Sequence, residues 1–94
     1  MLCGNDMVAR GVVDALRESG RDVPRDVSVI GHDNWVMIAS QVRPQLSTID
    51  MNLEELGRLA AQLLFAAIDG DVRPGQHSVP TRFIQRGSSA PKIW

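Results

Sequence analysis

Two short polar groups in the sequence carry side chains suited to hydrogen bonding a small, polyhydroxylated molecule. Asn5 and Asp6 follow the apolar residues 1–4, and Asp33 follows the apolar stretch 27–31 after one histidine. Planar amides and carboxylates present two acceptors, or a donor and an acceptor, to neighbouring hydroxyl groups of a sugar-like ligand. We therefore predict that Asn5 and Asp33 line a ligand pocket.

Each of these residues also has a purely structural explanation. Asn5 could be a turn residue that tolerates an unusual backbone angle, and Asp33 could cap a short helix that follows it. Asp6 is better explained as the N-cap of the next helix than as a ligand contact.

Trp35 and Leu53 are further candidates for the pocket. Trp35 could stack on the apolar face of a sugar or fill a gap beneath a short helix, and the usual role of large aromatic residues as anchors slightly favours packing. Leu53 stands at the start of a long helix and could line the pocket, although leucine at helical spacing is core by default. For His32, between the two groups of candidates, we expect a neutral, buried imidazole.

Catalytic and metal-binding chemistry finds little support in the sequence. The candidate nucleophiles, bases and ligands lack the close spacing of structural zinc motifs: Cys3, Asp6, His32, Asp33 and His77. No G-x-G-x-x-G or P-loop pattern is present. We expect no catalytic residues, no metal and no cofactor, and we do not expect an enzyme.

The elements that must position these residues alternate between strand and helix. Residues 1–4 read as the end of a buried strand, and an amphipathic helix then runs to Gly20. Residues 27–31 and 46–49 read as strands, and Asn52 caps a long helix that ends near Gly70. Residues 78–86 read as a last strand, with Pro80 suited to an edge or a crossing point. This order predicts an α/β fold with a mainly parallel sheet flanked by helices, in which ligands bind at the carboxyl ends of the strands.

Composition narrows the classes of partner. The 94 residues carry a net charge of -1 with a pI near 6.0, so we expect no nucleic acid binding by this segment. A single cysteine excludes an internal disulfide and fits a reducing, cytoplasmic location. No apolar segment is long enough to span a bilayer, and we expect no membrane partner.

Three stretches together resemble a known family. The sequence closely resembles the C-terminal part of LacI/GalR-family transcription regulators between about Leu2 and Ser89, through "CGNDMVARGVVDALRESGRDVPRDVSVIGHDNW", "RPQLSTIDMNLEELGRLAAQLL" and "PTRFIQRGSS". The resemblance implies a partial periplasmic-binding-protein-like fold that holds a sugar-like effector between two lobes. It also implies DNA binding only through an N-terminal helix-turn-helix headpiece that this sequence lacks. A fragment of a sugar-binding protein from a transport system is the alternative.

The resemblance further implies how the chain divides between lobes. About residues 1–49 and 80–89 would belong to the C-terminal lobe, and about residues 50–79 would carry a helix that normally packs on the N-terminal lobe. Without that lobe, the apolar stripe of the helix lacks its cover. We expect the helix either to fold back onto the chain's own strands or to be exchanged with a second copy.

A homodimer is the other partner that the resemblance implies. In the family, the first helix and the short helix after the second strand contribute to dimerisation, and the matching apolar candidates here are Val8, Val12, Met37, Ile38 and Val42. The alternative is that all five pack inward.

Overall fold

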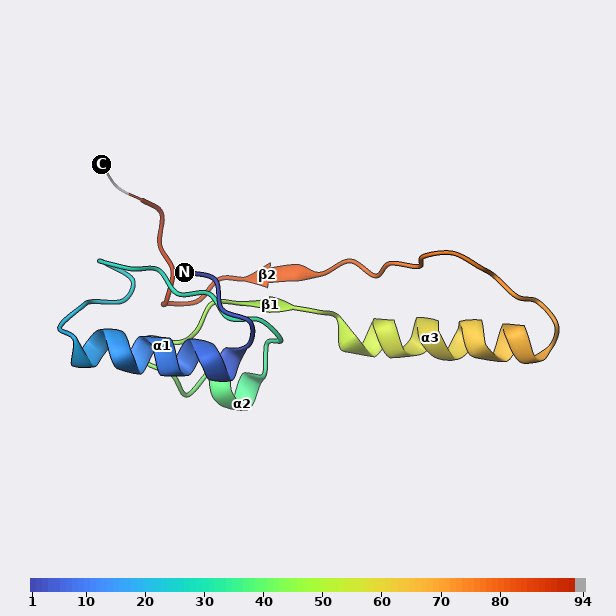
Figure 1. The fold of residues 1–94 in the computed structure, drawn as a ribbon, viewed down its shortest axis with the longest axis horizontal. Helices are drawn as coiled ribbons and strands as arrows, with labels where there is room; N and C mark the ends of the chain where they lie inside the picture. Colours follow the sequence, from blue (N-terminus) through green and yellow to red (C-terminus); the bar gives the residue numbers. More distant parts are fainter. Residues whose placement is uncertain (93–94) are drawn as a thin grey trace.

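The computed structural model describes residues 1–92, which form an elongated molecule of 59 × 28 × 16 Å. Its five elements are α1 (Asp6–Glu18), α2 (Val36–Ala39), β1 (Thr48–Asp50), α3 (Leu53–Ile68) and β2 (Arg82–Ile84). Figure 1 shows α1, α2 and the N-terminus gathered at one end and α3 projecting toward the other. We call residues 1–50 and 82–92 the packed unit, and residues 51–81 the arm.

Helix α1 begins where Asn5 caps it. The side-chain oxygen of Asn5 accepts a hydrogen bond from the Val8 amide at 2.8 Å, and Asn5 itself is extended, as an N-cap residue should be. The predicted cap, Asp6, is wrong, because this residue is one position inside the helix and its carboxylate is turned into the protein. The helix ends at Glu18, followed by Gly20 at a positive φ of 76°.

The regular strands pair differently from the sequence-based expectation. Strands β1 and β2 form a two-stranded antiparallel sheet in which Thr48 faces Ile84. Two isolated parallel bridges, Leu2 with Ile30 and Ile30 with Ser47, attach the first two predicted strands to it. The Val29 amide donates to the Ser88 carbonyl at 2.9 Å, so the bridge between Ile30 and Ser47 does not extend to this residue. A mainly parallel sheet is therefore not what the described residues form.

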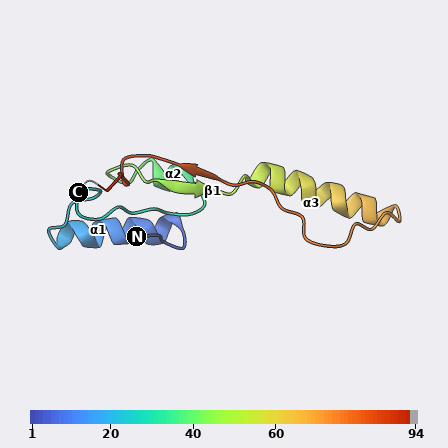
Figure 2. The same cartoon turned by 90° about the horizontal axis from the view of Figure 1, so that it is seen from above.

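The core lies between α1, α2 and these strand segments. Figure 2 shows α1 lying alongside the strand segments, with α3 extending beyond the end of this packed unit. Because the buried side chains come from helices and strand segments alike, the packed unit holds together through contacts distant in sequence. The buried apolar residues are Cys3, Ala9, Val13, Val29, Ala39, Val42 and Leu46.

The arm buries much less. Helix α3 has no buried residue, and most of its large apolar side chains are exposed: Leu53, Leu56, Leu64, Phe65 and Ile68. Residues 71–81 return from its far end toward β2 (Figure 1). The first of the two expected outcomes, a helix folded back onto the strands, is thus wrong for this structure. Within residues 1–92, no helix has the length and apolar character needed to cross a membrane.

Candidate ligand-binding site

The pairing register brings three polar residues to one edge of the packed unit. The bridged residues Leu2, Ile30 and Ser47 each precede one of them by three positions: Asn5, Asp33 and Asp50. The Gly31 amide donates to the Ser47 carbonyl at 2.8 Å and the Asp33 amide to the Ile49 carbonyl at 3.0 Å, so the two later segments stay aligned to this edge. Asn5 and Asp33 thus follow parallel, neighbouring segments.

Three of the four predicted ligand residues line a common pocket. Asp33, Trp35 and Leu53 border a cavity of about 440 Å³ together with Asn34, Val36 and Met51. The side chains of Trp35 and Leu53 remain accessible, because these residues are 52% and 57% exposed. Neither is therefore the core residue that their types alone would favour.

Asn5, the fourth predicted residue, does not line this pocket. Its Oδ1 atom is engaged in capping α1, the role that we predicted for Asp6, and its extended backbone is not the unusual conformation of the structural alternative. Gly4 borders a separate, mostly apolar hollow of about 410 Å³ with Leu2, Cys3, His32 and Ile49.

The backbone of the pocket wall is strained. Asp33 has a φ of 111° and Asn34 a φ of 51°, both in a region that residues with a side chain seldom adopt. Such strain costs of the order of 1–3 kcal/mol and clusters at functional sites, where the surroundings hold it in place. The Asp33 carboxylate lies 3.2 Å from Nδ1 of His32, which is half-buried and not the buried imidazole that we expected. Asp33 does not cap α2, whose N-cap is Trp35 without a side-chain bond.

Asp6 is a buried residue behind the pocket, and sequence reasoning placed it in the wrong role. Only 1% of its surface is exposed, its Oδ1 accepts from the Thr48 hydroxyl at 2.7 Å, and its Oδ2 accepts from the Trp35 amide at 2.7 Å. The carboxylate thereby fixes the pocket residue Trp35 to β1. One signal in the sequence was available: of the adjacent Asn5 and Asp6, only one can cap the helix.

Sequence reasoning also missed a polar chain behind the pocket. Asn34 donates from Nδ2 to Oδ2 of Asp50 at 3.1 Å, and its Oδ1 accepts from Nη2 of Arg86 at 2.8 Å. Oδ1 of Asp50 accepts from the Asn52 amide at 2.8 Å. The Asn52 hydrogen bond, then the Asn34 bond and the charge of Arg82, hold the pKa of the Asp50 carboxyl below its usual range.

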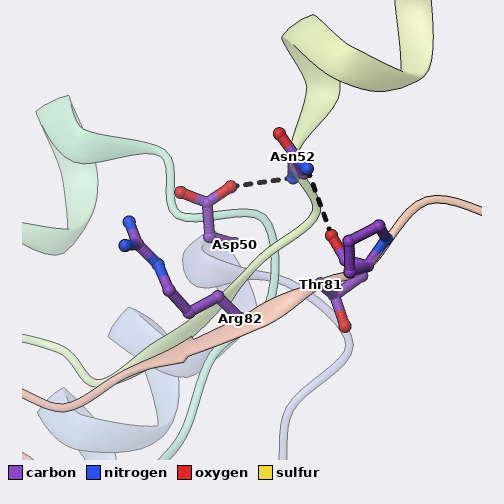
Figure 3. Close-up of a pocket in the computed structure, with 5 residues that line it drawn as sticks. Asp50, Asn52, Thr81 and Arg82 are labelled. Carbon is purple, nitrogen blue, oxygen red and sulfur yellow. Dashed lines mark hydrogen bonds between the residues drawn. The ribbon is translucent and has the colours of Figure 1, made fainter. Parts of the chain in front are cut away.

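A second, more polar pocket lies at the root of the arm (Figure 3). It has a volume of about 440 Å³ and is lined by Asp50, Asn52, Pro80, Thr81 and Arg82. Asn52 begins α3 with a φ of 57° but does not cap it through its side chain, which donates instead to the Pro80 carbonyl at 3.3 Å. This bond closes the arm at its base, where the chain leaves β1 and returns to β2.

The five dimer candidates fall into three groups. Val8 and Met37 are 52% and 75% exposed and available to a partner. Val12 and Ile38 are partly buried against the core, and Val42, at 5% exposure, belongs to the core itself. The inward-packing alternative therefore describes Val42.

The described side chains of metal-binding or nucleophilic type do not gather into a larger cluster. Burial raises the pKa of the Cys3 thiol, which disfavours the reactive thiolate. His77 lies in the arm, where its Nε2 is 2.9 Å from the Arg73 carbonyl oxygen. Among residues 1–92, no three His, Cys, Asp or Glu side chains form a group that could hold a metal ion.

Comparison with known proteins identifies the relatives of this chain. Residues 1–89 match the family described as periplasmic binding protein-like domain. The transcriptional regulator MalR of Streptomyces coelicolor is 36% identical over 91 residues, an alignment that covers 96% of this chain and 26% of MalR. The chain thus spans about a quarter of the length of such a relative.

Solved structures give the same picture. The lac repressor dimer bound to operator and an anti-inducer superposes with a TM-score of 0.89 at 31% identity, over 97% of this chain and 32% of the repressor chain. A LacI-family regulator from Arthrobacter sp. FB24 in complex with lactose superposes with a TM-score of 0.82 at 40% identity, over 95% of this chain and 34% of the other.

Proposed function

Because this chain belongs to the periplasmic binding protein-like domain family, we propose that it forms an effector-binding and dimer-forming part of a LacI-type transcription regulator. Its relatives are transcription regulators, which favours regulation over sugar transport and over catalysis. In this role the protein would act in the cytoplasm, with the DNA that its regulator controls. DNA would be bound by a separate headpiece and not by these residues, whose net charge is -1.

The observation that carries the proposal is the pocket shared by Asp33, Trp35 and Leu53. It combines a carboxylate on a strained backbone, an exposed indole ring and an aliphatic wall. Sugars are bound by such pairs of polar acceptors and apolar faces. We assign the pocket to a sugar or sugar derivative, the class of molecule that one structural neighbour holds as lactose and another as cellobiose.

We further propose that the pocket is one wall of a cleft between two lobes. About residues 1–49 and 80–89 would belong to one lobe and about residues 50–79 to the other. The exposed apolar face of α3 supports this division, since a helix of that composition needs a cover that residues 1–92 do not supply. An effector between the lobes would favour one lobe arrangement through its higher affinity for that state.

Dimerisation would use the exposed apolar residues of α1 and α2. Met7, Val8, Trp35, Val36 and Met37 are each about half exposed or more, and α1 and α2 lie in contact. Replacing Val8 or Met37 by Glu should lower the association measured by sedimentation equilibrium without unfolding the chain. Unchanged association in both variants would contradict this part of the proposal.

Effector binding is tested by titrating the isotopically labelled chain with lactose and with cellobiose while recording its amide NMR spectrum. We expect shifts at residues 33–36 and 51–53. The Asp33→Gly variant should lose them, and because glycine accepts the positive φ, this variant should keep its fold. The matched control is Asp14→Ala, which removes an exposed carboxylate of α1 and should bind as the parent chain does. A folded chain that shows no shift with either sugar would contradict the proposal.

A further inference from the structure

The side chain of Asn34 joins the end of β1, where the chain leaves for the arm, to Arg86, which follows β2 within the packed unit. Its amide nitrogen reaches Asp50, at the end of β1, where the chain leaves for α3. Its side-chain oxygen accepts a hydrogen bond from Arg86, two residues after the end of β2 and inside the packed unit. Asn34 also lines the pocket beside Asp33 and Trp35. One side chain thus touches the pocket, the outgoing crossing at Asp50 and a residue of the packed unit beyond β2.

We propose that Asn34 is a positioning residue that couples the ligand pocket to the arm. Displacement of the pocket wall would move the Asp50 carboxylate. Its Oδ2 atom accepts a hydrogen bond from the Asn34 side chain, and its Oδ1 atom accepts one from the backbone amide of Asn52, the N-cap residue of α3. The coupling adds a regulatory role to the proposed function. The coupling itself is argued from hydrogen bonds, and only the identity of the pocket's ligand rests on the proposed function.

The chemistry of the two partners explains why an amide is needed. Asp50 is an anionic acceptor and Arg86 a cationic donor, so the group between them must donate on one side and accept on the other. A carboxylate at position 34 would satisfy Arg86 but would face the Asp50 carboxylate with a like charge. Asparagine also tolerates the positive φ of 51° found there.

A second path fixes the same residue to the pocket. The backbone N–H of Asn34 donates to the Thr48 hydroxyl oxygen at 3.2 Å, and that hydroxyl donates to the Asp6 carboxylate at 2.7 Å. Asp6 in turn accepts from the Trp35 amide at 2.7 Å. Asn34 and Trp35 are therefore neighbours both along the chain and through a partly buried circuit of hydrogen bonds. A movement of Trp35 is transmitted to Thr48 in β1 as well as to Asn34.

Amide hydrogen exchange of the 94-residue chain, recorded without ligand, tests the coupling. The Asn34→Gly variant removes both side-chain bonds and keeps a residue that accepts the positive φ. We expect the amides of Asn52 and Leu56, at the root of the arm, to exchange about 10-fold faster, the size set by a lost hydrogen bond. The reciprocal variant, Asp50→Asn, should accelerate exchange at Trp35 in the pocket.

The control perturbs the arm without touching Asn34. Arg58 pairs with Glu54 and Glu55 in the first turns of α3, so Arg58→Ala should accelerate α3 amides and leave Trp35 unchanged. Acceleration confined to residues 33–36 in Asn34→Gly would overturn the coupling, and so would a uniform acceleration that includes the core residue Val13. Because no sugar is added, a failed sugar titration contradicts the proposed function alone.

Discussion

The two long helices of this chain differ in whether they bury side chains in the core. Helix α1 buries Ala9 and Val13 in the core, whereas the longer and more apolar α3 buries none of its residues. Both have a capping position, an acidic first turn and an apolar face. The comparison shows that a helical sequence pattern specifies the helix and the face that needs a cover, but not the surface that provides it.

The packed unit and the arm also differ in how far apart in sequence their bonded residues lie. In the packed unit, buried carboxylate, hydroxyl and backbone groups bind partners more than 25 residues away in sequence. In the arm, the ion pairs join residues at most four positions apart and lie on the surface. Cooperative stability should therefore reside in the packed unit, while the arm should behave as a locally stabilised helix.

The largest effect should come from shortening a core leucine. Leu46 is completely buried, so Leu46→Ala should lower the free energy of unfolding by about 2–5 kcal/mol, through lost burial and the cavity left behind. Leu64, in α3, is 60% exposed, and Leu64→Ala should change that energy by less than about 0.5 kcal/mol. Urea unfolding followed by circular dichroism measures both. Similar losses in the two variants would mean that the arm is covered in solution.

A pair of glycines gives the next largest difference. A Cβ atom at Gly31 would lie 2.2 Å from Oδ1 of Asp6 and 3.0 Å from Cδ2 of Leu46, so Gly31→Ala should destabilise the chain by about 3 kcal/mol. A Cβ atom at Gly57 meets nothing within 4 Å. Gly57→Ala should therefore make the free energy of forming α3 more favourable by up to about 1 kcal/mol, the difference in helix propensity between the two residues. Thermal unfolding at two wavelengths measures both changes. Tolerance of alanine at position 31 would show that Asp6 lies elsewhere.

Two aspartates of α1 allow a smaller, chemical comparison. Asp6→Asn replaces an acceptor by a donor opposite the Trp35 amide or the Thr48 hydroxyl and should cost about 2 kcal/mol. Asp14 is half exposed and pairs with Arg17, so Asp14→Asn should cost less than about 0.5 kcal/mol. Tryptophan fluorescence during urea unfolding reports both. An equal response would remove Asp6 from its role in positioning Trp35.

The sequence predicted local structure better than pairing. The extent of α1 and α3, the punctuation at Gly20 and Gly70, and the turn residues were readable because they depend on nearby residues. The antiparallel pairing of β1 with β2 depends on contacts more than 30 residues apart, which no local pattern encodes. The expected strand at 78–86 reduces to Arg82–Ile84, since the preceding residues belong to the returning arm.

The site could be predicted in part for the same reason. Polar residues after two strand segments gave Asp33, because strand ends share an edge whenever neighbouring segments run parallel. Sequence reasoning did not predict the roles of Asn34, Asp50 and Arg86, since these roles arise from contacts between residues 16–52 positions apart. Asn5 took the capping role predicted for Asp6, because either residue type can cap a helix. The contacts that hold the Asp6 carboxylate inside the protein come from the distant residues Trp35 and Thr48, which no local pattern reveals.

The smallest predicted effect concerns Asp50, where the packed unit meets the arm. Its folded pKa lies below the ordinary pKa of an aspartate side chain, so its contribution to stability is complete above that ordinary pKa and is lost as the pH falls through the folded pKa. NMR titration of the side-chain carboxyl carbon measures this directly. Asn34→Gly should raise the pKa toward its ordinary value, and Arg82→Ala should raise it less, because the charge of Arg82 contributes less than the Asn34 hydrogen bond. The reverse order would mean that charge at the root of the arm, and not the bond to the pocket, controls this carboxyl group.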